Sequence, residues 1–263
     1  MKLNSMENIR MIITDLDNTL LNKEGKITEY SKLIFSKCKE RGIIIVFATE
    51  KSCRNTQKLF GSIKPHATIC HCGGLVSIND IMCAKYLIPF DYAQSIIKLI
   101  MKNHEKINIG IECGNSIYAN FDIKMYWKNV SNKTLDLNKM PSRNIYKIVV
   151  GLEQIKYFDM IQKDIPNGFY IEKLENKAGI IMNKSSTKWN GIKSLLISFG
   201  IKEDNIVSFG DDDVDIEIIE KSGIGIAVEN GNEKIKSKAK YICKNNDEDG
   251  VAKWIEKNIL TLN

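Results

Sequence analysis

Arginine is scarce in this chain of 263 residues, because only Arg10, Arg41, Arg54 and Arg143 occur among 38 Lys+Arg. Bidentate recognition of anions by guanidinium groups is therefore limited. The formal net charge of +6 comes from lysines that are interleaved with acidic residues, a pattern typical of a solvated surface rather than a nucleic-acid-binding patch. We expect no nucleic-acid partner, and small anionic molecules suit this charge as a partner class.

Proline and long apolar runs are also rare. Four prolines and 43% hydrophobic residues exclude collagen, a proline-rich linker and general disorder. No apolar run approaches the roughly 18 residues of a membrane-spanning helix. Asp15 and Asp17 interrupt the first apolar stretch, which no signal peptide would tolerate. The length predicts one large or two modest domains, at roughly 150 residues each, with no membrane partner.

The seven cysteines are odd in number and lack a disulfide-like spacing, which favours a reducing compartment and a cytoplasmic location. The Cys70-His71-Cys72 sequence resembles a metal site at first sight. Adjacent side chains alternate across a strand, however, and only His66 and His104 remain as other histidines. We interpret this segment as the end of a strand that carries reduced thiols.

Strand and helix signals alternate at both ends of the chain, which predicts an α/β fold with a doubly wound parallel sheet covered by helices on both faces. The predicted strands are 10–14, 43–48, 67–70, 206–209 and 224–228, and the predicted helices are 28–41, 52–60, 188–199, 214–221 and 251–259.

The middle of the chain has a looser pattern, typical of an α+β module. The predicted strands there are 85–88, 107–112, 116–120, 146–151 and 169–174, and the predicted helices are 91–104 and 153–163. We therefore predict a core domain formed by residues 1–77 and 185–263, with a second domain inserted at 78–184. The oligomeric state is left open.

Two aspartates follow the first predicted strand, in Asp15-Leu16-Asp17-Asn18-Thr19. Ligands of open α/β sheets bind beyond the carboxyl ends of the strands, so both carboxylates could face one pocket. One would then attack and the other would move a proton. The alternative for an isolated D-x-D-x-T segment is an Asx turn.

Thr49 follows the second predicted strand, where a hydroxyl and backbone N–H groups could hold a phosphate, or the threonine could simply cap a helix. Lys188 stands at a predicted helix start. The helix dipole disfavours a cation there, so an anion explains this lysine better than helix stability does, unless the side chain only faces solvent.

Four aspartates crowd the segment Gly210-Asp211-Asp212-Asp213-Val214-Asp215 after another buried strand. Such carboxylates repel one another unless a cation neutralises them, and a hard ion such as Mg²⁺ fits oxygen ligands best. An acidic helix start could explain two of these aspartates but not readily all four.

The four segments together, in this order, resemble the haloacid dehalogenase-like (HAD) superfamily, and within it the Cof-type phosphatases with a large α/β cap. The resemblance covers essentially the whole chain and includes a glycine-bounded strand at 222–230 and a terminal Asp249-Gly250-Val251-Ala252 segment. It implies a Rossmann-like core, an inserted cap that selects substrates, and Mg²⁺-dependent hydrolysis of small phosphomonoesters such as sugar phosphates.

The resemblance also implies roles for single residues. Asp15 would be the nucleophile that forms an aspartyl-phosphate, and Asp17 the general acid and base. The Mg²⁺ ligands would be the Asp15 carboxylate, the Asp17 carbonyl and Asp211, with Asp215 orienting a bound water. The phosphoryl oxygens would be bound by Thr49, the backbone N–H of Glu50, and Lys188.

Three positions depart from the family pattern. Thr49-Glu50-Lys51 replaces Thr-Gly-Arg, so the Glu50 side chain must turn away or repel the substrate. Val214 replaces an asparagine and cannot donate its hydrogen bond. Cys72-Gly73-Gly74 replaces Asn-Gly-Ala. These departures keep two alternatives open: a catalytically weakened protein that binds a phosphorylated metabolite, and a phosphosugar mutase.

Overall fold

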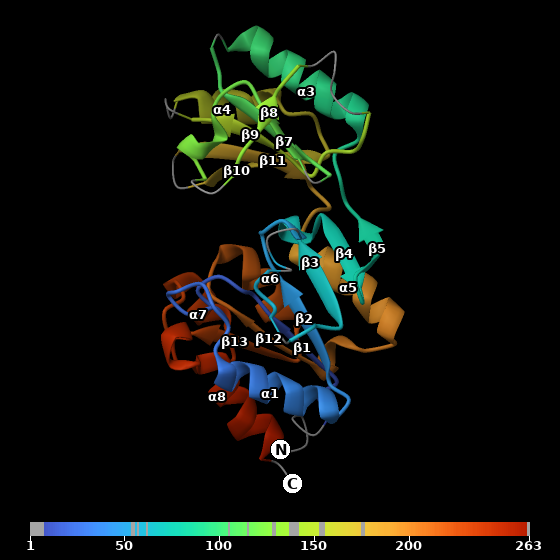
Figure 1. Cartoon of the computed structure of the whole chain (residues 1–263), viewed down its shortest axis with the longest axis vertical. Coiled ribbons are helices and arrows are strands. Elements are labelled where there is room, and N and C mark those ends of the chain that lie inside the picture. Colours follow the sequence, from blue (N-terminus) through green and yellow to red (C-terminus); the bar gives the residue numbers. More distant parts are fainter. Residues whose placement is uncertain are drawn as a thin grey trace. The chain divides into compact units, whose positions relative to one another are not determined.

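The computed structural model describes residues 8–53, 56, 58–61, 63–104, 106–114, 116–127, 130–136, 142–152, 156–174 and 177–261. The chain divides into two compact units, one formed by Met1–Lys85 with Thr187–Asn263 and one formed by Tyr86–Ser186 (Figure 1). The second unit therefore begins and ends at later residues than the predicted 78–184. The predicted helix at 52–60 lies partly outside the described residues.

The first unit is built on an eight-stranded sheet in the order β14-β13-β12-β1-β2-β3-β4-β5. Its strands are β1 (Met11–Thr14), β2 (Ile44–Ala48), β3 (Ala67–Cys70), β4 (Leu75–Ile78), β5 (Ile81–Lys85), β12 (Ile206–Gly210), β13 (Ile224–Val228) and β14 (Tyr241–Cys243). Neighbouring strands from β14 to β3 are parallel, whereas β4 and β5 are antiparallel. The doubly wound parallel core predicted from the sequence is confirmed.

The two faces of this sheet bury different side chains of the same strands, because successive residues of a strand point to opposite sides. Ile12 belongs to the core that includes Phe35 of α1 (Glu29–Glu40) and Ile255 of α8 (Gly250–Ile255). Met11 belongs to the opposite core, with residues of α5 (Lys188–Phe199) and α6 (Ile216–Lys221). Both faces are thus covered, which leaves the strand ends as the place for a cluster of charged side chains.

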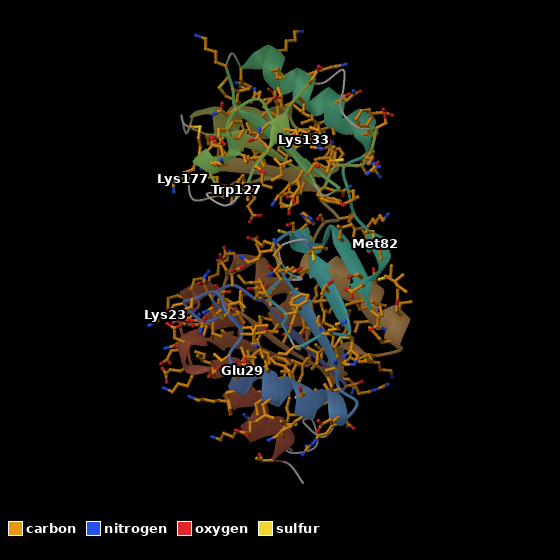
Figure 2. The ribbon with its side chains drawn as sticks, viewed as in Figure 1. Lys23, Glu29, Met82, Trp127, Lys133 and Lys177 are labelled. Carbon is orange, nitrogen blue, oxygen red and sulfur yellow. The ribbon has the colours of Figure 1, made fainter. Side chains whose placement is uncertain are left out.

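Several elements of the first unit and of its junction with the second differ from the predicted ones. The predicted strand 85–88 is wrong: β4 and β5 form a hairpin, and Ile88 makes only an isolated bridge to Ile145. Asn79 and Asp80 both have positive φ, as a two-residue hairpin turn requires. The short α7 (Glu233–Lys238) and β14 were not expected. Figure 2 shows Met82 on β5, the edge strand of the sheet.

The second unit holds a six-stranded sheet in the order β10-β11-β9-β6-β7-β8. Its strands are β6 (Ile109–Cys113), β7 (Ser116–Ala119), β8 (Lys133–Thr134), β9 (Lys147–Gly151), β10 (Phe169–Leu174) and β11 (Ala178–Asn183), and its helices are α3 (Phe90–Asn103) and α4 (Lys156–Asp164). A separate apolar core includes Ile97 of α3 and Ile148 of β9. The α+β character of this segment agrees with the sequence pattern.

Within the described residues, the structure contains no helix long and apolar enough to cross a membrane. All seven cysteines belong to the described part of the chain, and each is a thiol.

Candidate active site

Three parallel strands bring the predicted site residues to one edge of the core sheet. Strand β1 pairs with β12 on one side and with β2 on the other. Because parallel strands end at the same edge, the residues that follow them meet there. Asp15 follows β1, Thr49 follows β2 and Asp211 follows β12. The backbone N–H of Asp15 also donates to the carbonyl of Phe209 at 3.1 Å, which extends the sheet to the site.

A cavity of about 90 Å³ lies at this edge. The lining residues are Asp15, Asp17, Asn18, Thr49, Glu50, Lys188, Asp211, Asp212, Val214 and Asp215. Its floor is buried, since Asp15, Thr49, Lys188 and Asp215 are at most 6% exposed. Its rim includes the exposed Glu50. All the predicted site residues therefore belong to one cavity.

Lys188 lies between two buried carboxylates. Its Nζ is 2.6 Å from Asp15 Oδ1 and 2.7 Å from Asp215 Oδ1. Helix α5 places this lysine in its first turn, where Thr187 caps the helix by accepting a hydrogen bond from the N–H of Asn190. Burial by itself lowers the pKa of Lys188, but the charges of Asp15 and Asp215 raise that pKa well above its usual value. The ammonium group therefore stays charged.

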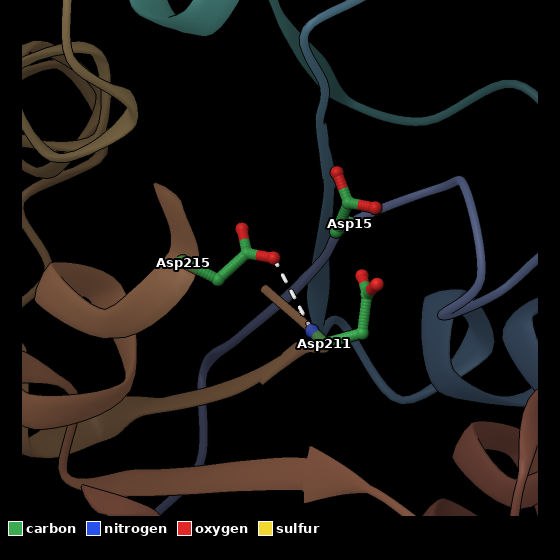
Figure 3. Close-up of side chains that lie close together, drawn as sticks. All are labelled: Asp15, Asp211 and Asp215. Atoms are coloured by element: carbon green, nitrogen blue, oxygen red, sulfur yellow. Dashed lines mark hydrogen bonds between the residues drawn. The ribbon is translucent and has the colours of Figure 1, made fainter. Parts of the chain in front are cut away.

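Asp211 is held from two sides. Thr19 Oγ1 donates a hydrogen bond to Asp211 Oδ1 at 2.8 Å, and the backbone N–H of Asp211 donates to Asp215 Oδ2 at 3.3 Å (Figure 3). Burial raises the pKa of Asp211 to about 6, with a further contribution from the charge of Asp215, while the Thr19 hydrogen bond opposes the rise. Carboxylates in this position favour a nearby positive charge.

The cluster of Asp15, Asp211 and Asp215 could hold a metal ion. One oxygen from each carboxylate lies within 4.8 Å of the other two, and Figure 3 shows the three side chains approaching one region. Burial raises the pKa of Asp15 well above its usual range; the charge of Lys188 opposes this rise and that of Asp215 adds to it. Three carboxylates against one ammonium leave an excess of negative charge, and their hard oxygen donors suit a hard divalent cation. The donor set thus fits such an ion.

Among the described residues, this is the only cluster of three or more His, Cys, Asp or Glu side chains with metal-binding spacing. The Cys70-His71-Cys72 segment is not part of it. That segment instead ends β3 and turns into β4, with positive φ at His71, Cys72 and Gly73.

Asp17 sits in a tight loop above the floor of the cavity. The carbonyl of the buried Leu16 accepts hydrogen bonds from Leu20 at 3.0 Å and Leu21 at 2.8 Å, which fixes the backbone on either side. The carboxylate of Asp17 is 2.8 Å from Lys51 Nζ. Asp15 and Asp17 are therefore paired with different lysines, Lys188 and Lys51.

Thr49 anchors the opposite wall. Its N–H donates to the carbonyl of Ile69 at 2.8 Å, and its hydroxyl accepts from the N–H of Lys51 at 3.1 Å. The N–H of Cys72 donates to the Thr49 carbonyl at 3.2 Å, and Cys72 Sγ lies 3.4 Å from Glu50 Oε1. The loop after β3 therefore holds both the backbone and the acidic side chain of this wall.

Several contacts of the site were not predicted from the sequence. Three of them join side chains: Thr19 with Asp211, Lys51 with Asp17, and Cys72 with Glu50. The fourth joins backbone groups, because the N–H of Asn232 donates to the Asp211 carbonyl at 3.0 Å. Only the contact between Thr19 and Asp211 had a sequence signal, because Thr19 is the threonine of the D-x-D-x-T segment. The other three depend on loops whose course the sequence does not determine.

The sequence of residues 12–255 matches the protein-family model of the haloacid dehalogenase-like hydrolases. A curated relative is the 5-amino-6-(5-phospho-D-ribitylamino)uracil phosphatase YcsE of Bacillus subtilis, which is 25% identical over 265 residues that cover 96% of each chain. The crystal structure of TM0651 from Thermotoga maritima has a TM-score of 0.85 at 23% identity, covering 95% of this chain and 97% of the other. The HAD subclass IIB sugar phosphatase BT4131 has a TM-score of 0.79 at 20% identity, covering 94% and 98%.

The fold and the site define a hydrolase with a doubly wound core and an acidic cluster at the carboxyl ends of its strands. The chain belongs to the haloacid dehalogenase-like hydrolase family, in agreement with the Cof-type resemblance of its motifs, and its curated relatives include phosphatases. The family and the enzyme class expected from the sequence motifs are confirmed.

Proposed function

We propose that this enzyme hydrolyses small phosphomonoesters, with Mg²⁺ as cofactor and an aspartyl-phosphate intermediate on Asp15. One observation carries the proposal: Asp15 lies buried beside Lys188 at the floor of the cavity, while Asp17, two residues later, lies half-buried above it. A nucleophile and a proton carrier that leave one strand together suit a two-step displacement at phosphorus.

In the first step, a carboxylate oxygen of Asp15 attacks the phosphorus atom and the bond from phosphorus to the ester oxygen breaks. Asp17 donates a proton to the departing alkoxide oxygen, so that the alcohol leaves neutral. Thr49 and Lys188 bind the phosphoryl oxygens, and the fixed ammonium of Lys188 reduces the repulsion between the carboxylate and the phosphate dianion.

In the second step, Asp17 removes a proton from a water molecule, whose oxygen attacks the phosphorus of the aspartyl-phosphate. The bond from phosphorus to the Asp15 oxygen breaks, which releases inorganic phosphate and restores the Asp15 carboxylate. Mg²⁺ would be held by Asp15, Asp211 and the backbone carbonyl of Asp17, with Asp215 in support, and when bound it supplies positive charge beside the phosphoryl group.

Sugar phosphates or related phosphorylated polyols are the proposed substrates, with the inserted unit, residues 86–186, as the cap that selects among them. Support comes from two relatives by name, a sugar phosphatase and a phosphatase of a phosphoribityl compound. The chemistry suits a phosphorylated metabolite of the cytoplasm, which is the location proposed here, and the thiol state of all seven cysteines agrees with it.

The test is release of inorganic phosphate from a panel of sugar phosphates, with Mg²⁺ or with EDTA, by the wild type and by Asp15→Asn. We expect Mg²⁺-dependent release by the wild type, none by the variant, and a phosphorylated protein after acid quenching of the wild type. Asp159→Asn, an exposed position in the second unit, is the matched control. Ligand binding without phosphate release would favour a sensing protein, and isomerised products without free phosphate would favour a mutase.

A further inference from the structure

The rim of the active-site cavity is acidic, and its charge is not balanced. Glu50 and Asp212 are exposed lining residues, and the third exposed lining residue, Asn18, is uncharged. Among the described lining residues, Lys188 is the only one with a positive charge, and it lies at the buried floor with Asp15 and Asp215. Outside the lining, Lys51 is paired with Asp17.

The two rim carboxylates differ in their partners. Asp212 Oδ1 accepts hydrogen bonds from Asn232 Nδ2 at 2.8 Å and from the N–H of Asp213 at 2.7 Å, so this side chain caps the turn that follows it. The Glu50 carboxylate is contacted by the thiol of Cys72. No cationic side chain in the described part of the chain pairs with Glu50, so the charge of this lining residue is not neutralised by an ion pair.

The position of Glu50 is fixed at one end by the strand. It directly follows Thr49, whose N–H and carbonyl are bonded to Ile69 and Cys72. The Cys72 thiol then holds the carboxylate close to this wall. A thiol is a weak donor that leaves most of a carboxylate's charge unquenched. Glu50 thus carries an exposed negative charge at the rim, on backbone that the hydrogen bonds of Thr49 hold in place.

The size of the cavity decides which part of a substrate meets this charge. The cavity is small, about 90 Å³ over a buried floor, so with the phosphoryl group bound at the floor the remainder of the ester extends toward the exposed rim residues. A second anionic group on that remainder would be repelled by Glu50, whereas a cationic group would be attracted.

We propose that Glu50 is a specificity-determining residue that selects phosphomonoesters whose remainder carries a positive charge, such as amino sugar phosphates, over those that carry a second negative charge. This inference rests on the proposed function and names a substrate class for the same site. It explains why a glutamate can lie beside a phosphate site. The backbone of residues 49–50 binds the phosphate, and the Glu50 side chain interacts with the remainder of the substrate.

Three six-carbon esters provide a matched test: glucosamine 6-phosphate, glucose 6-phosphate and 6-phosphogluconate differ in the charge of the group remote from the phosphate. Each is measured as a competitive inhibitor of p-nitrophenyl phosphate hydrolysis at low salt, so that slow turnover does not hide binding. We expect inhibition constants to rise in the order given, with the ammonium and carboxylate compounds differing by about tenfold, as unit charges near a protein surface produce. High salt should shrink this ratio.

The diagnostic variants change only the charge of the rim. Glu50→Gln should reduce the ratio of inhibition constants about fivefold, and Glu50→Lys should invert the order. Glu203→Gln is the matched control, because this exposed residue precedes β12 and lies at the opposite edge of the sheet. It should leave the ratio at its wild-type value.

Two failures are distinguishable. An unchanged ratio in Glu50→Gln and Glu50→Lys, with p-nitrophenyl phosphate still hydrolysed, would overturn the inference and leave the proposed function standing. No Mg²⁺-dependent hydrolysis of p-nitrophenyl phosphate by the wild type would overturn the proposed function, and the inference with it.

Discussion

Thr19 and Asp211 join the two ends of the active site: the hydroxyl of Thr19 donates to Asp211 Oδ1 at 2.8 Å, although 192 residues separate them in the sequence. Thr19 belongs to the loop after β1 and Asp211 to the loop after β12. The contact therefore ties the segment with the proposed nucleophile to the segment with the proposed metal ligand.

Removing this hydroxyl should cost stability. Thr19 is 1% exposed, so Thr19→Val keeps the shape but leaves Asp211 without its buried donor, and we expect a loss of about 1–3 kcal/mol in the free energy of unfolding. Urea unfolding measures it. Thr134→Val, at an exposed position of β8, should change little, and equal effects of the two substitutions would contradict the role assigned to the hydroxyl.

Replacing Lys188 with methionine should both destabilise the fold and abolish turnover. The substitution leaves Asp15 and Asp215 buried without their cation, which costs about 3–5 kcal/mol. Mg²⁺ should raise the melting temperature of Lys188→Met more than that of the wild type, because the variant cluster is more negative. Lys202→Met, at an exposed position, should behave like the wild type. If Mg²⁺ raised the melting temperatures of Lys188→Met and the wild type equally, this would argue against metal binding at this cluster.

The proposed proton transfer by Asp17 predicts a dependence on the leaving group. Asp17→Asn should lower kcat/KM for an alkyl ester such as glycerol phosphate by about 10²–10⁴-fold, because an alkoxide needs a proton to leave. Formation of the intermediate from p-nitrophenyl phosphate should be far less affected, since the nitrophenolate leaves without one. Pre-steady-state release of nitrophenolate measures that first step. Equal losses with both esters would assign Asp17 another role.

His66 predicts a pH dependence of stability. Burial, and next the charge of Lys39, lower the pKa of His66, whose Nδ1 accepts a hydrogen bond from the N–H of Ile45 at 2.9 Å. Because the folded-state pKa lies below the unfolded value, the stabilisation is complete above about pH 6.5 and is lost as the pH falls through the folded-state pKa.

The matched variant is His66→Asn, whose amide oxygen can accept the same hydrogen bond without titrating. Unfolding by urea at pH 7.5 and at pH 5 should show a larger loss of stability on acidification for the wild type than for the variant. Parallel pH profiles would contradict the assignment.

Substitution of Gly73 by alanine would test the close packing of this residue against the start of α5, the helix that carries Lys188. The φ of Gly73 is +107°, and a Cβ at this position would lie 2.0 Å from the carbonyl oxygen of Thr187, which caps α5. Gly25 also has positive φ, +71°, but open space around it. Gly25→Ala should cost about 1–2 kcal/mol, from the backbone alone. Gly73→Ala should cost about 3 kcal/mol more and lower phosphatase activity, because the helix that carries Lys188 must move. Thermal unfolding and phosphate release measure both effects.

The position of the site could be predicted from the sequence because it depends on a general rule. Parallel strands end at one edge, so residues placed after three buried strands, such as Asp15, Thr49 and Asp211, must meet there. The β-branched runs that form these strands are unambiguous, and the predicted helices 28–41 and 188–199 correspond to α1 and α5.

The parts that escaped prediction depend on weak local signals or on tertiary contacts. The β4–β5 hairpin is hard to predict from the sequence, because β5 is an exposed edge strand whose apolar residues do not alternate with polar ones. Helix α7 has only six residues, four of them charged. The direction of the Lys188 side chain could not be derived either, since its partners Asp15 and Asp215 come from distant segments.

The insertion points of the second unit have a consequence for how such a protein can diversify. The chain leaves the first unit after β5 and returns at Thr187, and α5 packs against β5, so both crossings belong to neighbouring elements at one side of the sheet. The residues proposed for the chemistry all lie outside the insertion. We therefore expect the inserted unit to tolerate changes of sequence and length while the aspartates and their lysines keep the same positions.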